Sequence, residues 1–259
     1  MPSAATLRRQ IELDLEERFP SALTPAPRTI HEVACTGIHA ADEILDGGLP
    51  VGAISEIAGP ASSGRTGLAL SFVARRTAEG RVCAWVDISD ALDPESAAAN
   101  GVNLKQLLWV RCRDTVQTIA GKSRPWTRLD QALRATDLLL QAGGFAAIVL
   151  DLADTTPEHA NRIPLATWFR YRQAADRTRC SLLVLGKAAY AQSSAALAIE
   201  CSPLRPDSAG GTVLRGFTYE LRRGRQRFAA GKVGVRPGER KPPVSTWSAG
   251  TAWEAERRA

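Results

Sequence analysis

The chain has 259 residues, of which 44% are hydrophobic and 23% are charged, so its composition is that of an ordinary globular protein able to bury a sizeable core. No apolar run approaches the roughly 20 residues that a membrane-spanning helix needs, and no apolar stretch follows the first arginines as it does in a secretory signal. Five dispersed cysteines without a CxxC pair argue against a disulfide framework and a structural zinc site. We therefore expect a cytoplasmic protein without membrane contact.

The net charge of +6 is concentrated toward the C-terminus. Between residues 213 and 241, nine arginines and lysines stand against two glutamates, and the rest of the chain is close to neutral. Such a patch attracts nucleic acid or an acidic protein, although a solvated surface gives the same pattern. The candidate DNA-binding residues are Arg222, Arg223, Arg225 and Arg227.

Residues 5–18 carry apolar side chains at helical spacing, which predicts an amphipathic helix. Its apolar stripe contains Leu7, Ile11 and Leu15. Prolines follow and predict an extended linker up to about residue 32. Because the apolar stripe of a detached helix needs a cover, we expect these three side chains to contact either another molecule or the chain's own core.

From about residue 33 the pattern alternates between strands and helices. Buried strands are predicted at residues 53–58, 82–88, 107–110, 146–151 and 181–185. Helices are predicted at residues 66–77, 93–99, 126–141 and 165–176. Because the strands are apolar along their length, we expect an α/β fold in which helices cover both faces of a mostly parallel sheet.

The C-terminal part has a different pattern, with strands predicted at residues 196–201, 212–221 and 227–235. We expect them to pair antiparallel through turns at residues 203–211 and 223–224. The segment from residue 237 is rich in proline, serine and glycine and is expected to be a mobile or partner-bound tail. In it, Trp247 and Trp253 are candidate partner anchors, because tryptophan is enriched in interface hot spots.

The predicted organisation has three parts. Residues 1–32 form the N-terminal helix and its proline-rich linker, residues 33–236 form the core with its antiparallel β extension, and residues 237–259 form the tail.

Residues 59–66, Gly-Pro-Ala-Ser-Ser-Gly-Arg-Thr, follow a predicted strand and precede a predicted helix, which is the context of a Walker A loop. In such a loop, backbone N–H groups hold phosphates, and the Thr66 hydroxyl would bind Mg²⁺. Arg65 stands at the lysine position, and its planar guanidinium does not fit the space of an ammonium group. We therefore favour weak or no nucleotide binding. The candidate nucleotide-binding residues are Gly59, Ser63, Gly64, Arg65, Thr66 and Gly67.

Asp151 ends the predicted strand at residues 146–151, and a buried strand ending in aspartate is the Walker B pattern. Asp151 is therefore the candidate Mg²⁺ ligand. A nucleotide at this site would be ATP or ADP with Mg²⁺.

Residues 35–200 resemble the RecA ATPase core in the order and spacing of their motifs. The resemblance rests on the glycine-rich stretch at residues 47–66 and on Ala-Trp-Val-Asp-Ile-Ser-Asp-Ala-Leu-Asp-Pro at residues 84–94. It implies a RecA-like fold, but Ser89 stands where RecA has its catalytic glutamate, and Ser96 stands where a tyrosine stacks on adenine. Both regions that correspond to DNA-binding loops are short. These joint changes predict that ATP-driven strand exchange has been lost.

Among RecA-like proteins with such losses, the chain is similar to the ImuA group in residues 18–23, in the 59–66 loop and in Trp168-Phe169-Arg170. ImuA-like proteins are encoded with ImuB and a DnaE-type polymerase in bacterial mutagenesis cassettes. The resemblance implies an accessory role in SOS-induced translesion mutagenesis, through contacts with ImuB, the DnaE-type polymerase or RecA, and self-association is an open question. It implies no catalytic residues and a protein that is not an active enzyme.

Two alternatives stay open at this point. One is an active ATPase of the RecA superfamily in DNA repair, with Arg65 and Thr66 on phosphate and Asp151 on Mg²⁺. The other is a DNA-binding module that uses the basic C-terminal strands.

Overall fold

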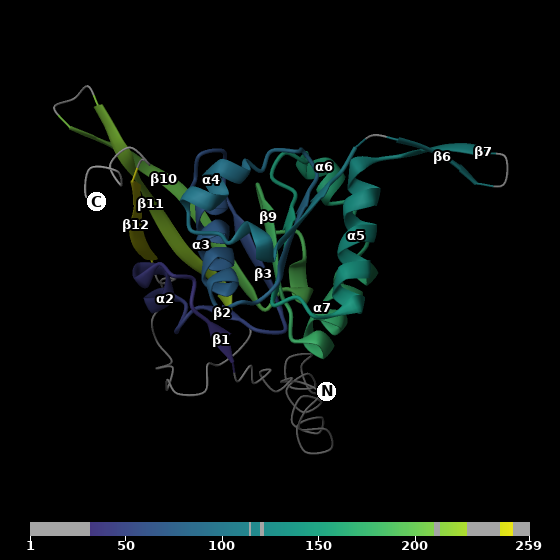
Figure 1. Ribbon diagram of the computed structural model, residues 1–259, viewed down its shortest axis with the longest axis horizontal. Coiled ribbons are helices and arrows are strands. Elements are labelled where there is room, and N and C mark those ends of the chain that lie inside the picture. The colour runs from purple at the N-terminus through teal and green to yellow at the C-terminus, as the bar shows by residue number, and fades with distance from the viewer. Residues whose placement is uncertain (1–31, 114, 120–121, 210–212, 227–243, 251–259) are drawn as a thin grey trace, which may run out of the picture.

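The computed structural model describes five stretches of the chain: residues 32–113, 115–119, 122–209, 213–226 and 244–250 (Figure 1). The helix expected at residues 5–18 and the strand expected at 227–235 lie outside the described residues, as do Arg227 and Trp253. Among the helices in these stretches, none is both long and apolar enough to cross a bilayer.

An eight-stranded sheet with the order β12-β11-β10-β3-β9-β8-β4-β5 forms the centre of the described structure. Its strands are β3 (Ile54–Ala58), β4 (Cys83–Asp87), β5 (Leu107–Arg111), β8 (Ala147–Asp151), β9 (Ser181–Gly186), β10 (Leu197–Ala209), β11 (Val213–Gln226) and β12 (Val244–Gly250). Neighbours from β10 to β5 pair in parallel, whereas β10, β11 and β12 pair antiparallel with one another in turn. This confirms the predicted α/β fold with an antiparallel C-terminal extension.

Helices cover both faces of this sheet (Figure 1). The main ones are α3 (Arg65–Ala78) and α4 (Pro94–Ala99) on one side and α5 (Arg128–Ala142) and α7 (Leu165–Thr178) on the other. Along β9, Leu183 packs in the core cluster that holds the α3 side chains, and Leu182 packs in the cluster that holds the α7 side chains. Strands buried on both faces need mostly apolar side chains, which explains the apolar runs of β8 and β9, whereas β3 also buries Ser55 and Glu56.

The remaining elements are short. They are β1 (Val33–Ala34), α2 (His39–Ile44), β2 (Leu49–Pro50), η1 (Leu104–Gln106), β6 (Thr115–Ile119), β7 (Lys122–Trp126), α6 (Pro157–Ala160) and η2 (Gln192–Ser194). The β6–β7 hairpin extends from the body (Figure 1) and was missed by the sequence analysis.

Side-chain caps fix where two of the helices begin. The Asp93 carboxylate accepts the backbone N–H groups of Glu95 and Ser96 at the start of α4. Thr127 and Asp130 form a capping box at the start of α5. Because Thr127 is the cap, α5 begins at Arg128, two residues later than predicted.

The C-terminal strands are longer than predicted. β10 continues through the predicted turn at residues 203–211 as far as Ala209, and β11 continues through the predicted turn at 223–224 as far as Gln226. A Cβ on Gly224 would lie 3.2 Å from the carbonyl oxygen of Ala198, so this glycine allows close approach of two strands and does not form a hairpin tip. The sequence predicted only antiparallel pairing for these strands. In the structure β10 also pairs in parallel with β3, and this pairing joins the extension to the core.

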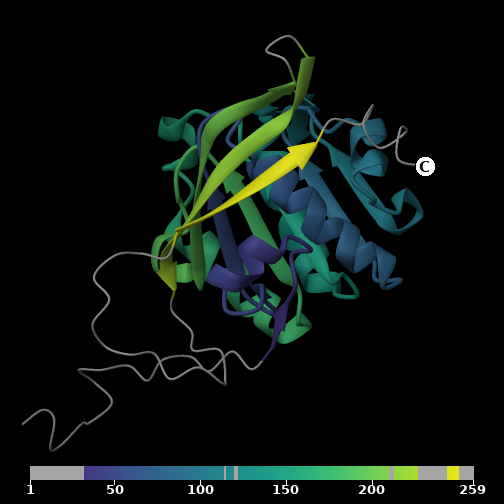
Figure 2. The same cartoon turned by 90° about the vertical axis from the view of Figure 1, so that its left-hand side faces the viewer.

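Residues 244–250 form β12 and lie inside the segment that was expected to be a mobile tail. The strand pairs with β11 at the edge of the sheet (Figure 2). For these seven residues the expectation of mobility was wrong, because β12 gains main-chain hydrogen bonds to β11 and buries the side chain of Trp247.

Candidate functional site

The loop at residues 59–64 connects β3 with α3, as a Walker A loop requires. Gly64, with φ of 84°, is the N-cap of α3, and only glycine adopts this left-handed conformation without strain. The structure thus places all six candidate nucleotide-binding residues in the loop or in the first turn of α3.

Arg65 points back into this loop. Its side chain is almost buried, with 8% of its surface exposed. The guanidinium Nη1 donates hydrogen bonds to the carbonyl oxygens of Gly59 and, at 3.0 Å, of Pro60. Arg65 is therefore held by backbone carbonyls of the loop itself, and its positive charge is ordered without a phosphate.

Two aromatic rings cover the outer side of the loop. A Cβ on Gly64 would come within 2.8 Å of Tyr219 Cγ and 2.9 Å of Trp247 Cζ2, and one on Gly67 would come within 3.1 Å of Trp247 Cη2. The two ring centroids lie 4.8 Å apart at an interplanar angle of 36°. The start of α3 is therefore in contact with side chains from β11 and β12, which lie at the far end of the sequence.

This packing corrects one prediction about Trp247. The sequence suggested a partner anchor in a tail, but the side chain is only 9% exposed and belongs to the core cluster around α3. Its role in the described structure is intramolecular.

Asp151 ends β8 next to Asp87, which ends the neighbouring strand β4. Burial raises the pKa of Asp151 to about 6, and the negative charge of Asp87 acts in the same direction. A hydrogen bond from the Ala153 backbone N–H at 3.0 Å and the charge of Arg65 oppose this shift of the pKa. Within the described residues no three His, Cys, Asp or Glu side chains gather as a metal site, and Asp87 is the acidic residue aligned with Asp151 on the neighbouring strand.

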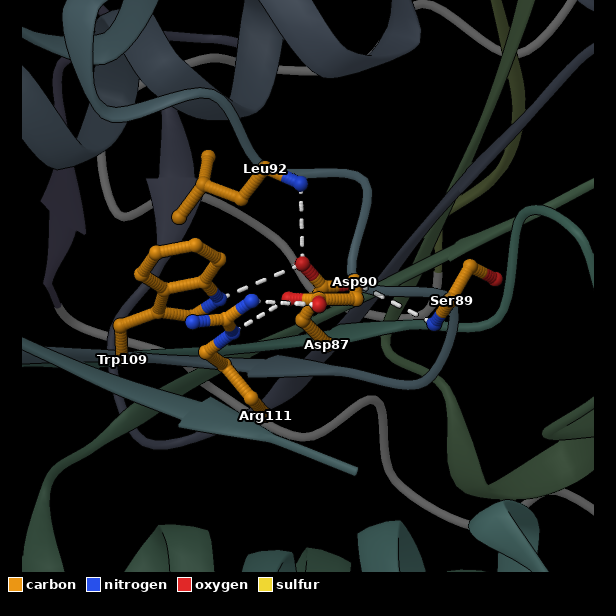
Figure 3. Close-up of polar contacts among 6 residues, drawn as sticks. All are labelled: Asp87, Ser89, Asp90, Leu92, Trp109 and Arg111. Carbon is orange, nitrogen blue, oxygen red and sulfur yellow. Dashed lines mark hydrogen bonds and ion pairs between the residues drawn. The ribbon is translucent and has the colours of Figure 1, made fainter. Parts of the chain in front are cut away.

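Asp87 is fully buried and is committed to the protein's own hydrogen bonds (Figure 3). Its carboxylate accepts the backbone N–H of Leu92 at 2.8 Å, the backbone N–H of Ser89 at 3.2 Å and the indole N–H of Trp109 at 3.2 Å. These bonds fix the loop after β4, in which Ser89 stands at the position where the resemblance to RecA implies a catalytic acid.

The next acidic residue, Asp90, is also occupied. It has φ of 59° and forms a two-pronged ion pair with Arg111 of β5. The Arg111 guanidinium lies over the Trp109 ring, with its Cζ 4.6 Å from a ring centroid (Figure 3). This network could not be predicted from the sequence, because the strand pairing that aligns Asp87 with Arg111 leaves no local pattern.

Three of the four candidate DNA-binding arginines lie within the described part of the chain, and each of these three has a partner there. Arg223 pairs with Asp46 at 2.6 Å, and Arg225 donates to the Gln192 carbonyl and lies 3.9 Å from Glu56. Arg222 lies within 4 Å of two glutamates, Glu200 and Glu220. Much of the charge of these three arginines is therefore balanced within the chain.

Comparisons with known proteins identify related sequences and a related fold. The sequence matches the family described as the RecA N-terminal domain over residues 22–161, which is more than half of the chain. It is 41% identical over 129 residues to Protein RecA of Ruegeria pomeroyi, covering 49% of this chain and 33% of that protein. It is 43% identical over 129 residues to Protein RecA of Cereibacter sphaeroides, covering 49% and 34%. The chain thus spans about a third of the length of these curated relatives.

Among solved structures, the chain is similar to the RadB recombinase, with a TM-score of 0.57 and 18% identity over 83% of this chain and 94% of that one. At this level of identity the likeness establishes the fold alone.

Proposed function

The chain belongs to the RecA family, and on this premise we propose that it is a non-catalytic or weakly nucleotide-binding member that serves as an accessory protein in translesion DNA synthesis. The observation that carries the proposal is the state of the phosphate loop. Arg65 is bound by the loop's own carbonyls, and Trp247 and Tyr219 lie against Gly64. A nucleotide would have to compete with contacts that the protein already makes.

The surroundings of the loop support a non-catalytic role. Position 89 carries a serine, whose hydroxyl cannot act as a general base at neutral pH without an activating neighbour. The nearby carboxylates of Asp87 and Asp90 are bound to protein donors, and burial disfavours the charged form of Asp151. The described residues therefore fit ATP and Mg²⁺ poorly, and we derive no catalytic step through them.

The accessory role follows from the ImuA-like features of the sequence. We propose that ImuB, a DnaE-type polymerase and RecA are the partners and that the setting is the SOS response in the cytoplasm. The N-terminal helix and linker at residues 1–32 would serve as a contact module beside the core, and residues 237–259 would form a separate C-terminal segment anchored by β12. Membership of the RecA family supports this setting.

An active ATPase remains the second candidate, because the loop keeps its strand–turn–helix geometry and because the Ser63 hydroxyl is buried without a hydrogen-bond partner among the described residues. Measuring ATP turnover separates the two candidates. We expect background turnover from the wild-type protein and the same value from Asp151→Ala. Turnover that Asp151→Ala abolishes would establish the ATPase and overturn the non-catalytic proposal.

The partner proposal needs a separate test, because loss of ATPase activity says nothing about contacts. Purified protein is mixed with RecA, with ImuB and with the DnaE-type polymerase, and complex formation is measured by light scattering after size exclusion. We expect at least one stable complex at micromolar concentration. Absence of every complex would remove the accessory role.

DNA binding through the basic strands is not favoured, because Arg222, Arg223 and Arg225 have partners within the chain. An affinity for single-stranded DNA that falls steeply with salt and is lost in Arg222→Ala would reverse this judgement.

A further inference from the structure

Helix α7 has a second apolar side that the described residues leave uncovered. Trp168 and Tyr171 are buried beneath the helix in the core cluster of α5 and α7. Leu165 and Phe169, one turn apart on the other side, are 55% and 47% exposed. Exposed apolar side chains that lie next to each other form a patch, and contiguous apolar patches mark contact surfaces, whereas single exposed residues do not. We call Leu165, Ala166 and Phe169 the outer face of α7.

The outer face has basic neighbours. The guanidinium of Arg172 lies over the Phe169 ring at 4.7 Å, and α7 carries three arginines against one aspartate. A complementary occupant would therefore combine an apolar stripe with negative charge. Residues 5–18 offer such a stripe in Leu7, Ile11 and Leu15, and their negative charge is confined to residues 12–17, which hold four acidic residues and no basic one. The three arginines of the segment, Arg8, Arg9 and Arg18, lie outside this acidic run.

The described fold begins beside α7. Glu32, its first residue, forms an ion pair with Arg179, which directly follows the helix. Phe169 lies ten residues before Arg179, which is about 15 Å along a helix. The linker at residues 19–31 can span up to about 43 Å, so it is long enough for residues 5–18 to contact the outer face of the same chain.

We propose that residues 5–18 dock as an amphipathic helix on the outer face of α7 in the same chain. Leu7, Ile11 and Leu15 pack on Leu165 and Phe169, and the acidic run at residues 12–17 lies beside the arginines of α7. This contact hides the apolar stripe from other molecules until a partner displaces it. The inference does not depend on nucleotide chemistry or on the identity of a partner.

Backbone hydrogen exchange of the full-length protein, measured by mass spectrometry, tests this contact. We expect residues 5–18 to exchange at least about tenfold more slowly than an unprotected peptide. Phe169→Glu should remove this protection. Leu204→Glu is the matched control, because Leu204 is similarly exposed, at 53%, but lies on β10, and it should leave the protection unchanged. Unprotected exchange in the wild-type protein, or protection that persists in Phe169→Glu, would overturn the proposal.

Two further measurements keep the test decisive. Ile11→Asp changes the docking segment itself, so it should remove protection of residues 5–18 without altering the thermal unfolding of the core; retained protection counts against docking. Protection and molecular mass are also followed from low to high micromolar concentration. Docking within one chain predicts values that do not depend on concentration, and protection that grows with dimer formation would make a second copy the occupant and refute docking within one chain.

Discussion

Gly64 and Trp247 lie so close together that a Cβ on the glycine would come within 2.9 Å of the tryptophan Cζ2 atom. The edge strand β12 therefore contacts the phosphate loop at a position that lacks a side chain. Since the same glycine also has φ of 84°, its substitution affects both the backbone and the ring packing.

Gly64→Ala is expected to lower the free energy of unfolding by about 1–3 kcal/mol more than Gly80→Ala does. Gly80 has a similar φ of 73° but nothing within 4 Å of an added Cβ, so it measures the backbone cost alone. Urea unfolding of both variants gives the difference. If both variants lost the same free energy of unfolding, the packing of Trp247 and Tyr219 against Gly64 would contribute nothing to the cost.

Arg65→Lys is expected to strengthen the binding of ATP with Mg²⁺ by about tenfold, or about 1.4 kcal/mol. A lysine ammonium is more compact than the guanidinium that now bonds to Gly59 and Pro60, so the loop gains room for phosphate. Turnover should stay at background, because Ser89 supplies no carboxylate. Calorimetry and a phosphate-release assay measure the two quantities. Arg65→Ala is the control, because it removes the guanidinium from the loop carbonyls without adding an ammonium group. If Arg65→Ala bound ATP as strongly as Arg65→Lys, the gain in affinity would not come from the lysine charge.

The raised pKa of Asp151 makes stability depend on pH. The native state binds this proton more tightly than the unfolded chain, so the Asp151 contribution to the free energy of unfolding falls as pH rises from about 4 to about 6 and is constant above that. Asp151→Asn removes this cost and still offers an oxygen to the Ala153 N–H. The variant is expected to be more stable than wild type by up to about 3 kcal/mol at pH 7.5 and to match it near pH 4. Urea unfolding at pH 7.5 and near pH 4 measures this difference. If Asp151→Asn were less stable than wild type at pH 7.5, native contacts would offset the cost of burying the charged Asp151 carboxylate.

The pair between Arg223 and Asp46 is expected to tie β11 to the segment after α2. Its 2.6 Å contact joins side chains that are largely shielded from water. A double-mutant cycle with Arg223→Ala and Asp46→Ala should give a coupling energy of about 1 kcal/mol that shrinks in 1 M salt. A coupling energy near zero would leave Arg223 available for the DNA contact that the sequence suggested.

Sequence reasoning found the loop, its arginine and most of the core strands. These features are local: a continuous apolar run defines a buried strand, and a short glycine- and serine-rich stretch before a helical pattern defines the loop. It failed at Trp247, because the proline- and glycine-rich surroundings of that residue are typical of a tail. The pairing of β12 with β11 depends on residues far apart in the chain and leaves no local signal.

The sequence by itself determined that this is a RecA-like α/β protein with altered chemistry at positions 65 and 89, because residue identity decides which functional groups are present. Only the tertiary structure decided that Arg65 turns onto the carbonyls of its own loop and that two rings from the C-terminal strands lie against Gly64. Such contacts form when strand pairing brings distant segments together, and they depend on packing distances of a few ångströms that no local pattern of residues encodes.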